Sequence, residues 1–137
     1  MLLHTTTQYA IRVLVYISKN GNDKLYTAKE LSEVLGIPYK KKKKIMTDLA
    51  KSNFINSIRG REGGYELSKP SSKITIYDII ESFKDIEDET KCILGIGKCD
   101  KNNKCVLHNE CFIPRDSIRE MYKNTTLDKF TDQNFKM

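Results

Sequence analysis

The sequence predicts a mainly α-helical fold that contains one small β-hairpin. Apolar residues recur at helical spacing in several segments, and residues typical of helix caps stand at the ends of those segments. A glycine-rich turn separates two short alternating segments, as in a hairpin. With 39% hydrophobic residues in 137, the chain has enough apolar side chains for one compact core.

The first predicted helix runs from about Thr6 or Thr7 to Lys19, and Asn20-Gly21 ends it. The second begins at Thr27, whose hydroxyl can cap the helix while Glu30 reaches back as in a capping box, and it ends at Gly36. The apolar stripe of the first helix is Ala10, Val13, Leu14 and Ile17. The buried face of the second is Leu31, Val34 and Leu35.

A third helix is expected at about 38–51, directly after Ile37-Pro38, with Ile45, Met46 and Leu49 buried. Two short helices joined by a tight glycine-containing turn form a helix-turn-helix, whose second helix reads DNA. Residues 54–59 then predict a strand, 60–64 a turn and 65–67 a returning strand. A hairpin at this place predicts the wing of a winged helix-turn-helix, at about 57–65.

The rest of the chain predicts two more helices. Thr75 opens one, with Ile76, Ile79, Ile80 and Phe83 at helical spacing, and Pro114 fits the first turn of a long final helix. The stripe of the final helix is Ile118, Met121, Tyr122 and Thr125, and Leu127 and Phe130 can extend it. Its apolar face can bury against a second copy, giving a homodimer, or against its own domain. We expect a DNA-binding domain at 1–84, a cysteine-rich loop at 85–112 and a dimerisation helix with its tail at 113–137.

Positive charge is concentrated in the first half of the chain. Residues 1–70 carry 13 Lys and Arg against 6 Asp and Glu, whereas residues 71–137 carry 11 against 12. A surplus confined to one half predicts either a surface that binds a polyanion or a solvated surface without a partner. Together with the helix-turn-helix and the wing, it predicts double-stranded DNA as the partner. The expected DNA-contacting residues are Thr27, Tyr39, Lys40, Lys41, Lys43, Lys44, Arg59 and Arg61. Lys42 falls on the apolar stripe, where its stem can be buried with its ammonium group in water, and Tyr39 could equally well pack.

Four cysteines and a histidine lie within residues 92–111, in the pattern Cys-x6-Cys-x5-Cys-x2-His-x2-Cys. Thiolates and imidazole at such spacing can hold zinc or an iron–sulfur cluster. Cys92, Cys99 and Cys105 with His108 would suit a [2Fe–2S] cluster or zinc. All four cysteines, with Cys111, would suit a [4Fe–4S] cluster or zinc. Three cysteines with a ligand from elsewhere in a dimer, or thiols without a metal, remain as further alternatives.

Several function classes are disfavoured. No apolar run approaches the roughly 20 residues that span a membrane, and the first residues lack the pattern of a signal peptide. We therefore expect a cytoplasmic protein without a membrane partner, where grouped cysteines favour metal or redox chemistry over disulfides. His4 is the only other histidine, and no orienting acid or phosphate-cradling loop completes a catalytic site, so we expect no enzyme. An iron–sulfur electron carrier is the further alternative, although it would have no use for the lysine run.

The chain resembles the Rrf2 family of bacterial winged-helix transcriptional regulators over about residues 1–130. The segments that carry the resemblance are Gln8–Leu14, Ala28–Ser32, Gly36–Pro38, Ile58–Tyr65, Ile76–Ile80 and Cys105–His108. The resemblance implies a homodimer formed through the long C-terminal helix, with a cluster near that helix modulating DNA binding. It also implies redox state, nitric oxide or iron supply as signals.

Within this resemblance, Cys92, Cys99 and Cys105 match the three cysteine ligands of the family, and His108 matches the histidine of IscR-like members. Gln8 falls where NsrR-like members place an aspartate ligand, and an amide is a poor cluster ligand. The resemblance therefore favours His108 as the fourth ligand, with Cys111 as the alternative. The chain departs from the family in its first cysteine gap of six residues, and in Lys43, where IscR-like members place a glutamate.

Overall fold

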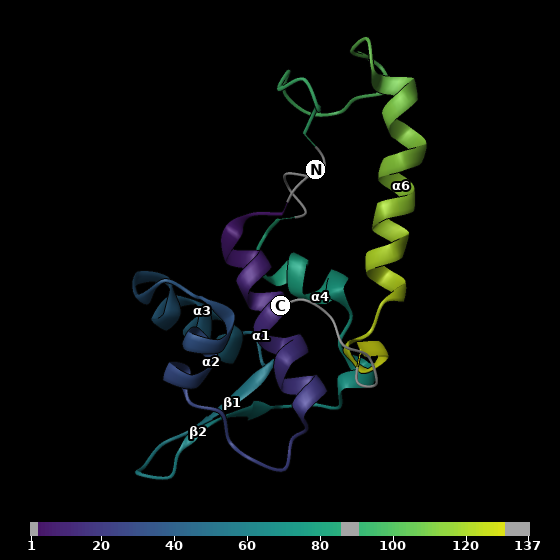
Figure 1. The fold of residues 1–137 in the computed structure, drawn as a ribbon. Helices are drawn as coiled ribbons and strands as arrows, with labels where there is room; N and C mark the ends of the chain where they lie inside the picture. The colour runs from purple at the N-terminus through teal and green to yellow at the C-terminus, as the bar shows by residue number, and fades with distance from the viewer. Residues whose placement is uncertain (1–2, 86–90, 131–137) are drawn as a thin grey trace.

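The computed structural model describes residues 3–85 and 91–130 (Figure 1). A helical body with one hairpin forms its lower part, and a long helix with the cysteine segment extends above this body. The elements in chain order are α1 (Thr5–Asn20), α2 (Ala28–Leu35), α3 (Tyr39–Lys51), β1 (Ile55–Ile58), β2 (Gly64–Leu67), the 3-10 turn η1 (Ser71–Lys73), α4 (Ile76–Ser82), α6 (His108–Asn124) and the 3-10 turn η2 (Leu127–Phe130).

Helix α1 is the centre of the core, because α2, α3, α4, β2 and η2 all pack against it. The four residues of its predicted stripe are completely buried, which confirms the prediction: Ala10, Val13, Leu14 and Ile17. The predicted buried side of α3 is confirmed as well, since Ile45, Met46 and Leu49 are at most 2% exposed. The inner side of α3 is therefore anchored in the core, and its opposite side faces solvent.

Helix α2 begins at the predicted cap but differs from the prediction in two details. The Thr27 hydroxyl accepts a hydrogen bond from the Glu30 N–H at 3.1 Å, whereas the Glu30 carboxylate lies 2.9 Å from Lys24 Nζ. The predicted capping box is thus only half formed, because the lysine takes the carboxylate. Val34 was predicted to be buried and is 52% exposed, since this short helix packs through Leu31 and Leu35, one turn apart.

Strands β1 and β2 form an antiparallel hairpin in which Ile55 pairs with Leu67 and Ile58 with Gly64. Two turn glycines explain why the connection can be so tight. Gly60 has φ +118°, a conformation that side chains disfavour, and a Cβ on Gly63 would collide with the Ile58 carbonyl oxygen. The helix-turn-helix followed by this hairpin confirms the predicted winged-helix architecture.

Helix α4 starts at Thr75 as predicted and carries a complete capping box with Asp78. Helix α6, in contrast, starts at His108, so the expected start at Pro114 is wrong by almost two turns. Pro114 lies inside α6, where it lacks an N–H donor and its ring crowds the carbonyl of the preceding turn, and the helix forms in spite of this cost. The first turn of α6, from His108 to Ile113, is closed by backbone hydrogen bonds of its own. One of its bonds runs from the Cys111 N–H to the Leu107 carbonyl at 2.9 Å. The residues at 131–137 of the predicted tail lie outside the described part.

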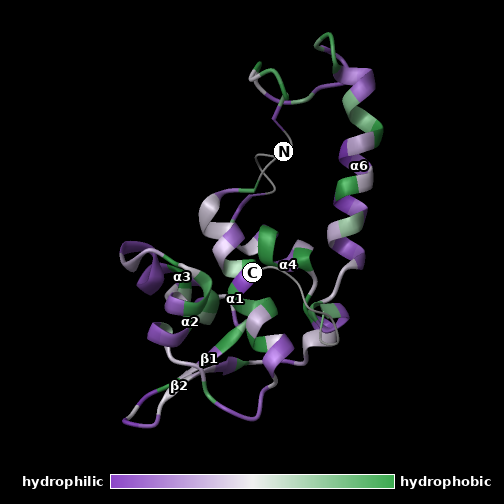
Figure 2. Cartoon of the chain, viewed as in Figure 1, coloured by the Kyte–Doolittle hydropathy of each residue, from purple (hydrophilic) through white to green (hydrophobic). Residues whose placement is uncertain are grey.

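The lower end of α6 packs against its own domain, whereas its upper part lies apart from the helical body (Figure 1). Tyr122 and Phe130 pack against the core and Leu127 is fully buried in it. Packing onto its own domain therefore accounts for this part of the predicted stripe. Phe112, Ile113 and Met121 on α6 remain 64%, 71% and 53% exposed, and Figure 2 shows apolar stretches that alternate with polar ones along this helix. None of the helices in the described ranges is long and apolar enough to cross a membrane.

Candidate nucleic-acid interface and metal centre

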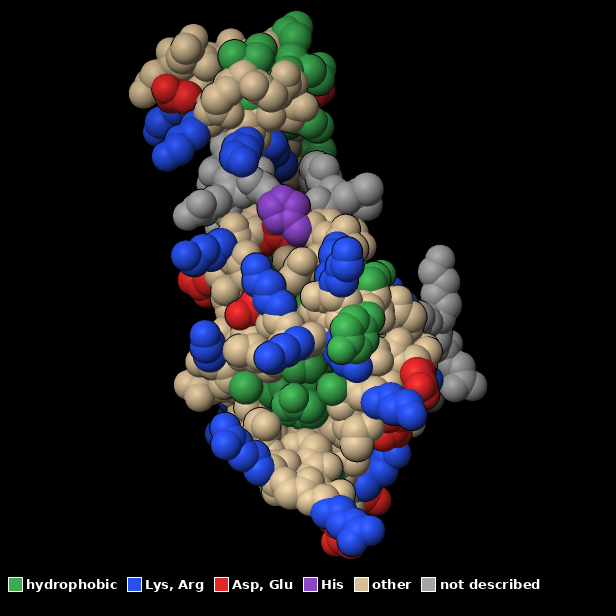
Figure 3. Space-filling view, turned by 90° about the vertical axis from the view of Figure 1, so that its left-hand side faces the viewer, with side chains coloured by type: hydrophobic (Ala, Val, Ile, Leu, Met, Phe, Trp, Pro, Cys, Tyr) green, Lys and Arg blue, Asp and Glu red, His purple; other side chains and the backbone are tan. Residues whose placement is uncertain are grey.

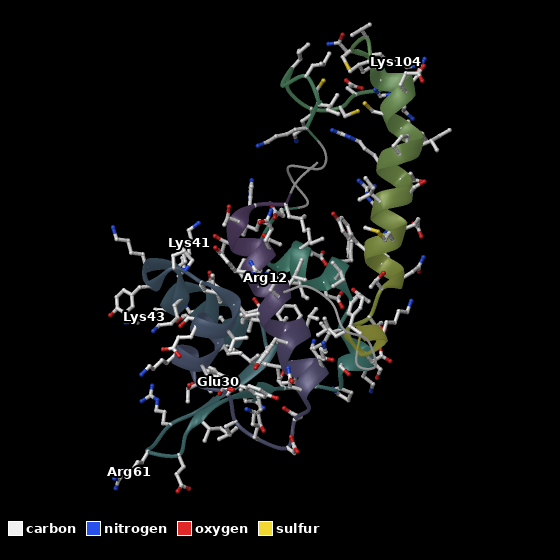
Figure 4. The ribbon with its side chains drawn as sticks, in the orientation of Figure 1. Arg12, Glu30, Lys41, Lys43, Arg61 and Lys104 are labelled. Carbon is white, nitrogen blue, oxygen red and sulfur yellow. The ribbon has the colours of Figure 1, made fainter. Side chains whose placement is uncertain are left out.

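Helix α3 and the hairpin lie on the same side of the molecule. Figure 3 shows this side, where Lys and Arg side chains are spread from the hairpin upward and outnumber the acidic ones. Lys41 and Lys43 of α3 and Arg61 at the hairpin tip all project from it (Figure 4). A helix and a wing that present cations together match the two contacts that winged helices make with DNA.

Three of the four predicted lysines of α3 are exposed, namely Lys40, Lys43 and Lys44, and Lys41 is half-buried. Their positions follow from the core, because Ile45, Met46 and Leu49 take the inner side of the helix. Lys42 is half-buried too, and its Nζ lies 5.0 Å from the centroid of the Tyr39 ring. Its stem is thus partly covered while its ammonium group lies on an exposed ring.

Tyr39 at the start of α3 is 84% exposed. The alternative that it packs into the protein is therefore wrong, and its ring is available to a groove-facing contact. Thr27 is exposed as well. Its hydroxyl oxygen accepts a hydrogen bond from the Glu30 N–H as the cap of α2, which leaves the hydroxyl hydrogen to donate to a phosphate.

Arg59 and Arg61 are exposed at the hairpin tip. Contacts outside the hairpin hold it in place, and the sequence did not predict them. Tyr26 pairs with Tyr65 through two backbone hydrogen bonds of 2.9 and 2.7 Å, and Asn22 Oδ1 accepts from the Leu67 N–H at 3.1 Å. The loop before α2 thus forms a single β-bridge to β2, and this bridge holds the hairpin against the helical body.

Arg12 is a second residue that the sequence analysis missed. It lies on α1 (Figure 4) and its Nη2 donates to the Leu35 carbonyl at 2.7 Å. This carbonyl is at the C-terminal end of α2, beside Gly36 in the left-handed conformation. The guanidinium thus ties the tight turn of the helix-turn-helix to the central helix, which keeps α3 at a fixed angle.

The five predicted metal ligands lie together at the upper end of the molecule. His108 begins α6 and is 9% exposed, and its Nδ1 lies 3.4 Å from Cys99 Sγ. Cys92 is buried, Cys99 is exposed, and Cys105 and Cys111 are half-buried. Cys92 lies in a tight hairpin. The Cys92 N–H donates to the Gly97 carbonyl at 2.9 Å, and the backbones of Lys91 and Lys98 form a β-bridge.

Cys92 and Cys105 form a second contact, with opposite effects on the two thiols. The N–H groups of Leu94 and Ile96 bond the Cys92 sulfur and hold its pKa below the usual range, helped by a hydrogen bond from Cys105. The same bond to Cys92 raises the pKa of Cys105, and burial adds to this effect. Cys92 is therefore the thiol of this pair that ionises first.

The donor set fits an iron–sulfur cluster in its chemistry. It offers thiols and an imidazole, and two backbone N–H groups bond the sulfur of Cys92, one of the candidate ligands, as is typical of cluster sites. The described residues form two pairs, Cys92 with Cys105 and Cys99 with His108, and not one group of three or more ligands. Gln8, near the start of α1, donates to the Leu3 carbonyl at 2.8 Å.

Comparison with known proteins identifies the family of the chain. The model of the Rrf2 family, described as an iron-dependent transcriptional regulator, matches residues 3–133. The chain belongs to the Rrf2 family. It is therefore a transcriptional regulator with a winged-helix DNA-binding domain, as the geometry of α3 and the hairpin indicates.

Two relatives are at least 33% identical to the chain in sequence. An HTH-type transcriptional regulator of Aquifex aeolicus (strain VF5) is 34% identical over 129 residues, which cover 93% of this chain and 89% of the relative. The transcriptional regulator NsrR of Oceanobacillus iheyensis is 33% identical over 112 residues, which cover 81% and 72%.

Solved structures of this family share the fold. CymR, the global cysteine regulator of B. subtilis, superposes with a TM-score of 0.78 at 19% identity, covering 98% of this chain and 99% of CymR. IscR of T. potens gives a TM-score of 0.72 at 20% identity, covering 96% and 88%. The likeness to both extends along almost the whole Rrf2 chain, including the long C-terminal helix.

Proposed function

We propose that this Rrf2 regulator binds an operator as a homodimer, and that a cysteine-ligated iron–sulfur cluster modulates this binding. The observation that carries the proposal is the Cys99–His108 contact of 3.4 Å beside the Cys92–Cys105 pair, at the N-terminal, upper end of α6. The iron-dependent description of the matching family supports it. Cys92, Cys99, Cys105 and His108 would hold the cluster, with Cys111 as the alternative fourth ligand.

When bound, the cluster would supply a charge and a ligand set that change with electron transfer, nitric oxide or iron supply. The residues of the chain provide the coupling. His108 and Cys111 belong to α6, and the lower end of the same helix packs against α4 and the core. A coupling free energy of about 1–3 kcal/mol between ligand site and reading head suffices for a 5- to 150-fold change in DNA affinity.

In the proposed complex, α3 enters the major groove and the wing follows the adjacent minor groove. Exposed Lys40, Lys43 and Lys44 contact phosphates, and Arg59 and Arg61 reach the minor groove. The dimer forms through the exposed apolar residues of α6, which have no cover in one chain: Phe112, Ile113 and Met121. Sedimentation of the wild type beside Ile113→Glu tests this interface, and a wild-type monomer at micromolar concentration would contradict it.

The cluster is tested by protein purified without air. We expect visible absorbance with iron and sulfide in the wild type, and its loss in Cys99→Ala, together with a change of operator affinity when the cluster is removed. The contact between Cys92 and Cys105 favours a second candidate, in which zinc or thiol oxidation replaces the cluster in the same regulator. A colourless wild type after reconstitution with iron and sulfide would favour this candidate, and zinc analysis would then separate metal from thiol chemistry.

A further inference from the structure

One basic residue of α6 contacts the cysteine segment and has no place in the DNA-binding surface. Arg115 donates from Nη2 to the carbonyl oxygen of Lys91, 24 positions earlier in the chain. Lys91 directly precedes Cys92. The contact therefore ties the start of the cysteine hairpin to the long helix.

Arg115 lies on the side of α6 that faces the cysteine segment. His108, Cys111 and Arg115 follow each other at spacings of three and four residues, so they share one face of the helix. All three are at least partly buried, whereas Phe112, Ile113 and Pro114 between them are exposed. The guanidinium is thus part of the same surface as two candidate ligands.

The anchored carbonyl determines where the Cys92 sulfur lies. Residues 91–98 form a closed hairpin: Lys91 bridges Lys98, the Cys92 N–H donates to the Gly97 carbonyl at 2.9 Å, and the Gly95 N–H donates to the Cys92 carbonyl at 2.8 Å. A hairpin this tight moves as one unit, so a bond at Lys91 fixes the whole of it. A guanidinium always keeps its charge, so the bond to the Lys91 carbonyl holds a permanent cation at the start of the Cys92 hairpin.

We propose that Arg115 is a positioning residue of the cysteine site, which anchors the Cys92 hairpin to α6 and places a permanent positive charge beside the ligands. The inference rests on the proposed cluster for its redox part and on the described contacts alone for its anchoring part. Through this bond a movement of the hairpin becomes a movement of α6, the helix whose other end packs on the DNA-binding body.

The test uses the full chain with Arg115→Gln, Arg115→Lys and the control Lys101→Gln, which removes an exposed charge from the same segment. In the metal-free protein, hydrogen exchange at residues 91–98 is expected to be about tenfold faster in both Arg115 variants, because a charge-assisted hydrogen bond of about 1.5 kcal/mol is lost. The control is expected to exchange at the wild-type rate.

In the reconstituted protein, an anaerobic redox titration followed by visible absorbance measures the effect of the Arg115 charge on the reduction potential of the cluster. Arg115→Gln is expected to make the reduction potential more negative, because the reduced cluster loses a nearby cation, and Arg115→Lys is expected to restore the wild-type value. Should Arg115→Gln fail to fold, the lysine variant still tests the anchor through faster exchange at an unchanged potential.

Two outcomes overturn the inference: wild-type exchange at 91–98 in both Arg115 variants, or a shift of potential in Lys101→Gln as large as that in Arg115→Gln. A wild type that takes up no cluster contradicts the proposed function instead. The exchange rates of the metal-free protein then decide alone whether Arg115 anchors the hairpin.

Discussion

His4 and Asp85 make two contacts with each other, which link the residue before α1 to the segment that follows α4. The His4 backbone N–H donates to Asp85 Oδ2 at 3.0 Å, and the His4 Nδ1 atom lies 2.5 Å from Asp85 Oδ1. The Asp85 side chain is 2% exposed and that of His4 is 63% exposed. The residue from which the chain leaves for the cysteine segment is therefore held on the first turn of the central helix.

Replacing Asp85 by Ala is expected to lower the free energy of unfolding by about 1–3 kcal/mol, because it leaves the His4 N–H without its charged acceptor. Urea denaturation measures the change, with Asp116→Ala on the exposed side of α6 as a control for the loss of one carboxylate. Equal stabilities of the two variants would show that the His4–Asp85 pair contributes nothing.

The lysines of α3 are expected to act through phosphates. Lys43→Ala should weaken operator binding and reduce the steepness of log K against log salt concentration by about 1, since one released counterion is lost. Titrations at graded salt measure this slope. Lys73→Ala, an exposed lysine of η1 away from α3 and the wing, should leave affinity and slope unchanged. A slope that changes equally in both variants would assign the effect to net charge.

The wing depends on a backbone contact that only glycine permits. Gly63→Ala would bring a methyl group onto the Ile58 carbonyl oxygen, so the turn must open and Arg59 and Arg61 must move. We expect operator affinity to fall at least tenfold while the helical content by circular dichroism stays unchanged. Ser57→Ala, exposed on the same hairpin, is the matched control, and wild-type affinity of Gly63→Ala would show that the wing tolerates this shift.

Tyr26 is a buried phenol that connects α1 with the wing. Its hydroxyl donates to the Gly21 carbonyl at 2.7 Å, and burial raises the pKa of the phenol. Tyr26→Phe should lower the free energy of unfolding by about 1 kcal/mol at neutral pH. Because the folded-state pKa is raised, this contribution is complete below about pH 10 and is lost as the pH rises through the folded-state pKa. Unfolding curves at pH 7 and near 11 measure it, with exposed Tyr39→Phe as the control.

Local signals predicted most of the fold. The caps at Thr27 and Thr75 and the stripe of α1 depend on neighbours within one or two turns, so they can be read from the sequence. The early start of α6 and the exposure of Val34 could not be read in this way. Proline is compatible with a helix interior at some cost, and apolar spacing does not show which residues of a short helix receive a partner.

The candidate sites show the same division. The clustered lysines predicted the DNA-binding surface and the cysteine spacing predicted the metal site, because composition and spacing are properties of the sequence itself. The Arg115–Lys91 and Tyr26–Tyr65 contacts join segments that are 24 and 39 positions apart, and only the folded chain brings them together. The one sequence signal for Arg115 was its spacing of seven residues from His108, on the same helix face.

The fourth ligand distinguishes two arrangements of the cysteine site. His108 contacts Cys99, whereas Cys111 lies one turn further along α6, close enough to Cys105 that its thiolate contributes to the raised pKa of Cys105. With His108 as ligand, His108→Ala should lose the cluster or bind it with an altered visible spectrum, and Cys111→Ser should keep the wild-type spectrum. With Cys111 as ligand the two results exchange.

Anaerobic reconstitution of both variants, with iron, sulfide and absorbance measured on each, separates the arrangements. His108→Cys provides the matched rescue, because a thiolate at the same position can replace the imidazole. Since cluster loss from misfolding would also remove DNA binding, operator affinity of the metal-free proteins serves as the control. We expect His108→Ala to keep the operator affinity of the metal-free wild type, so a loss of affinity would assign its effect to the fold of α6 rather than to ligation.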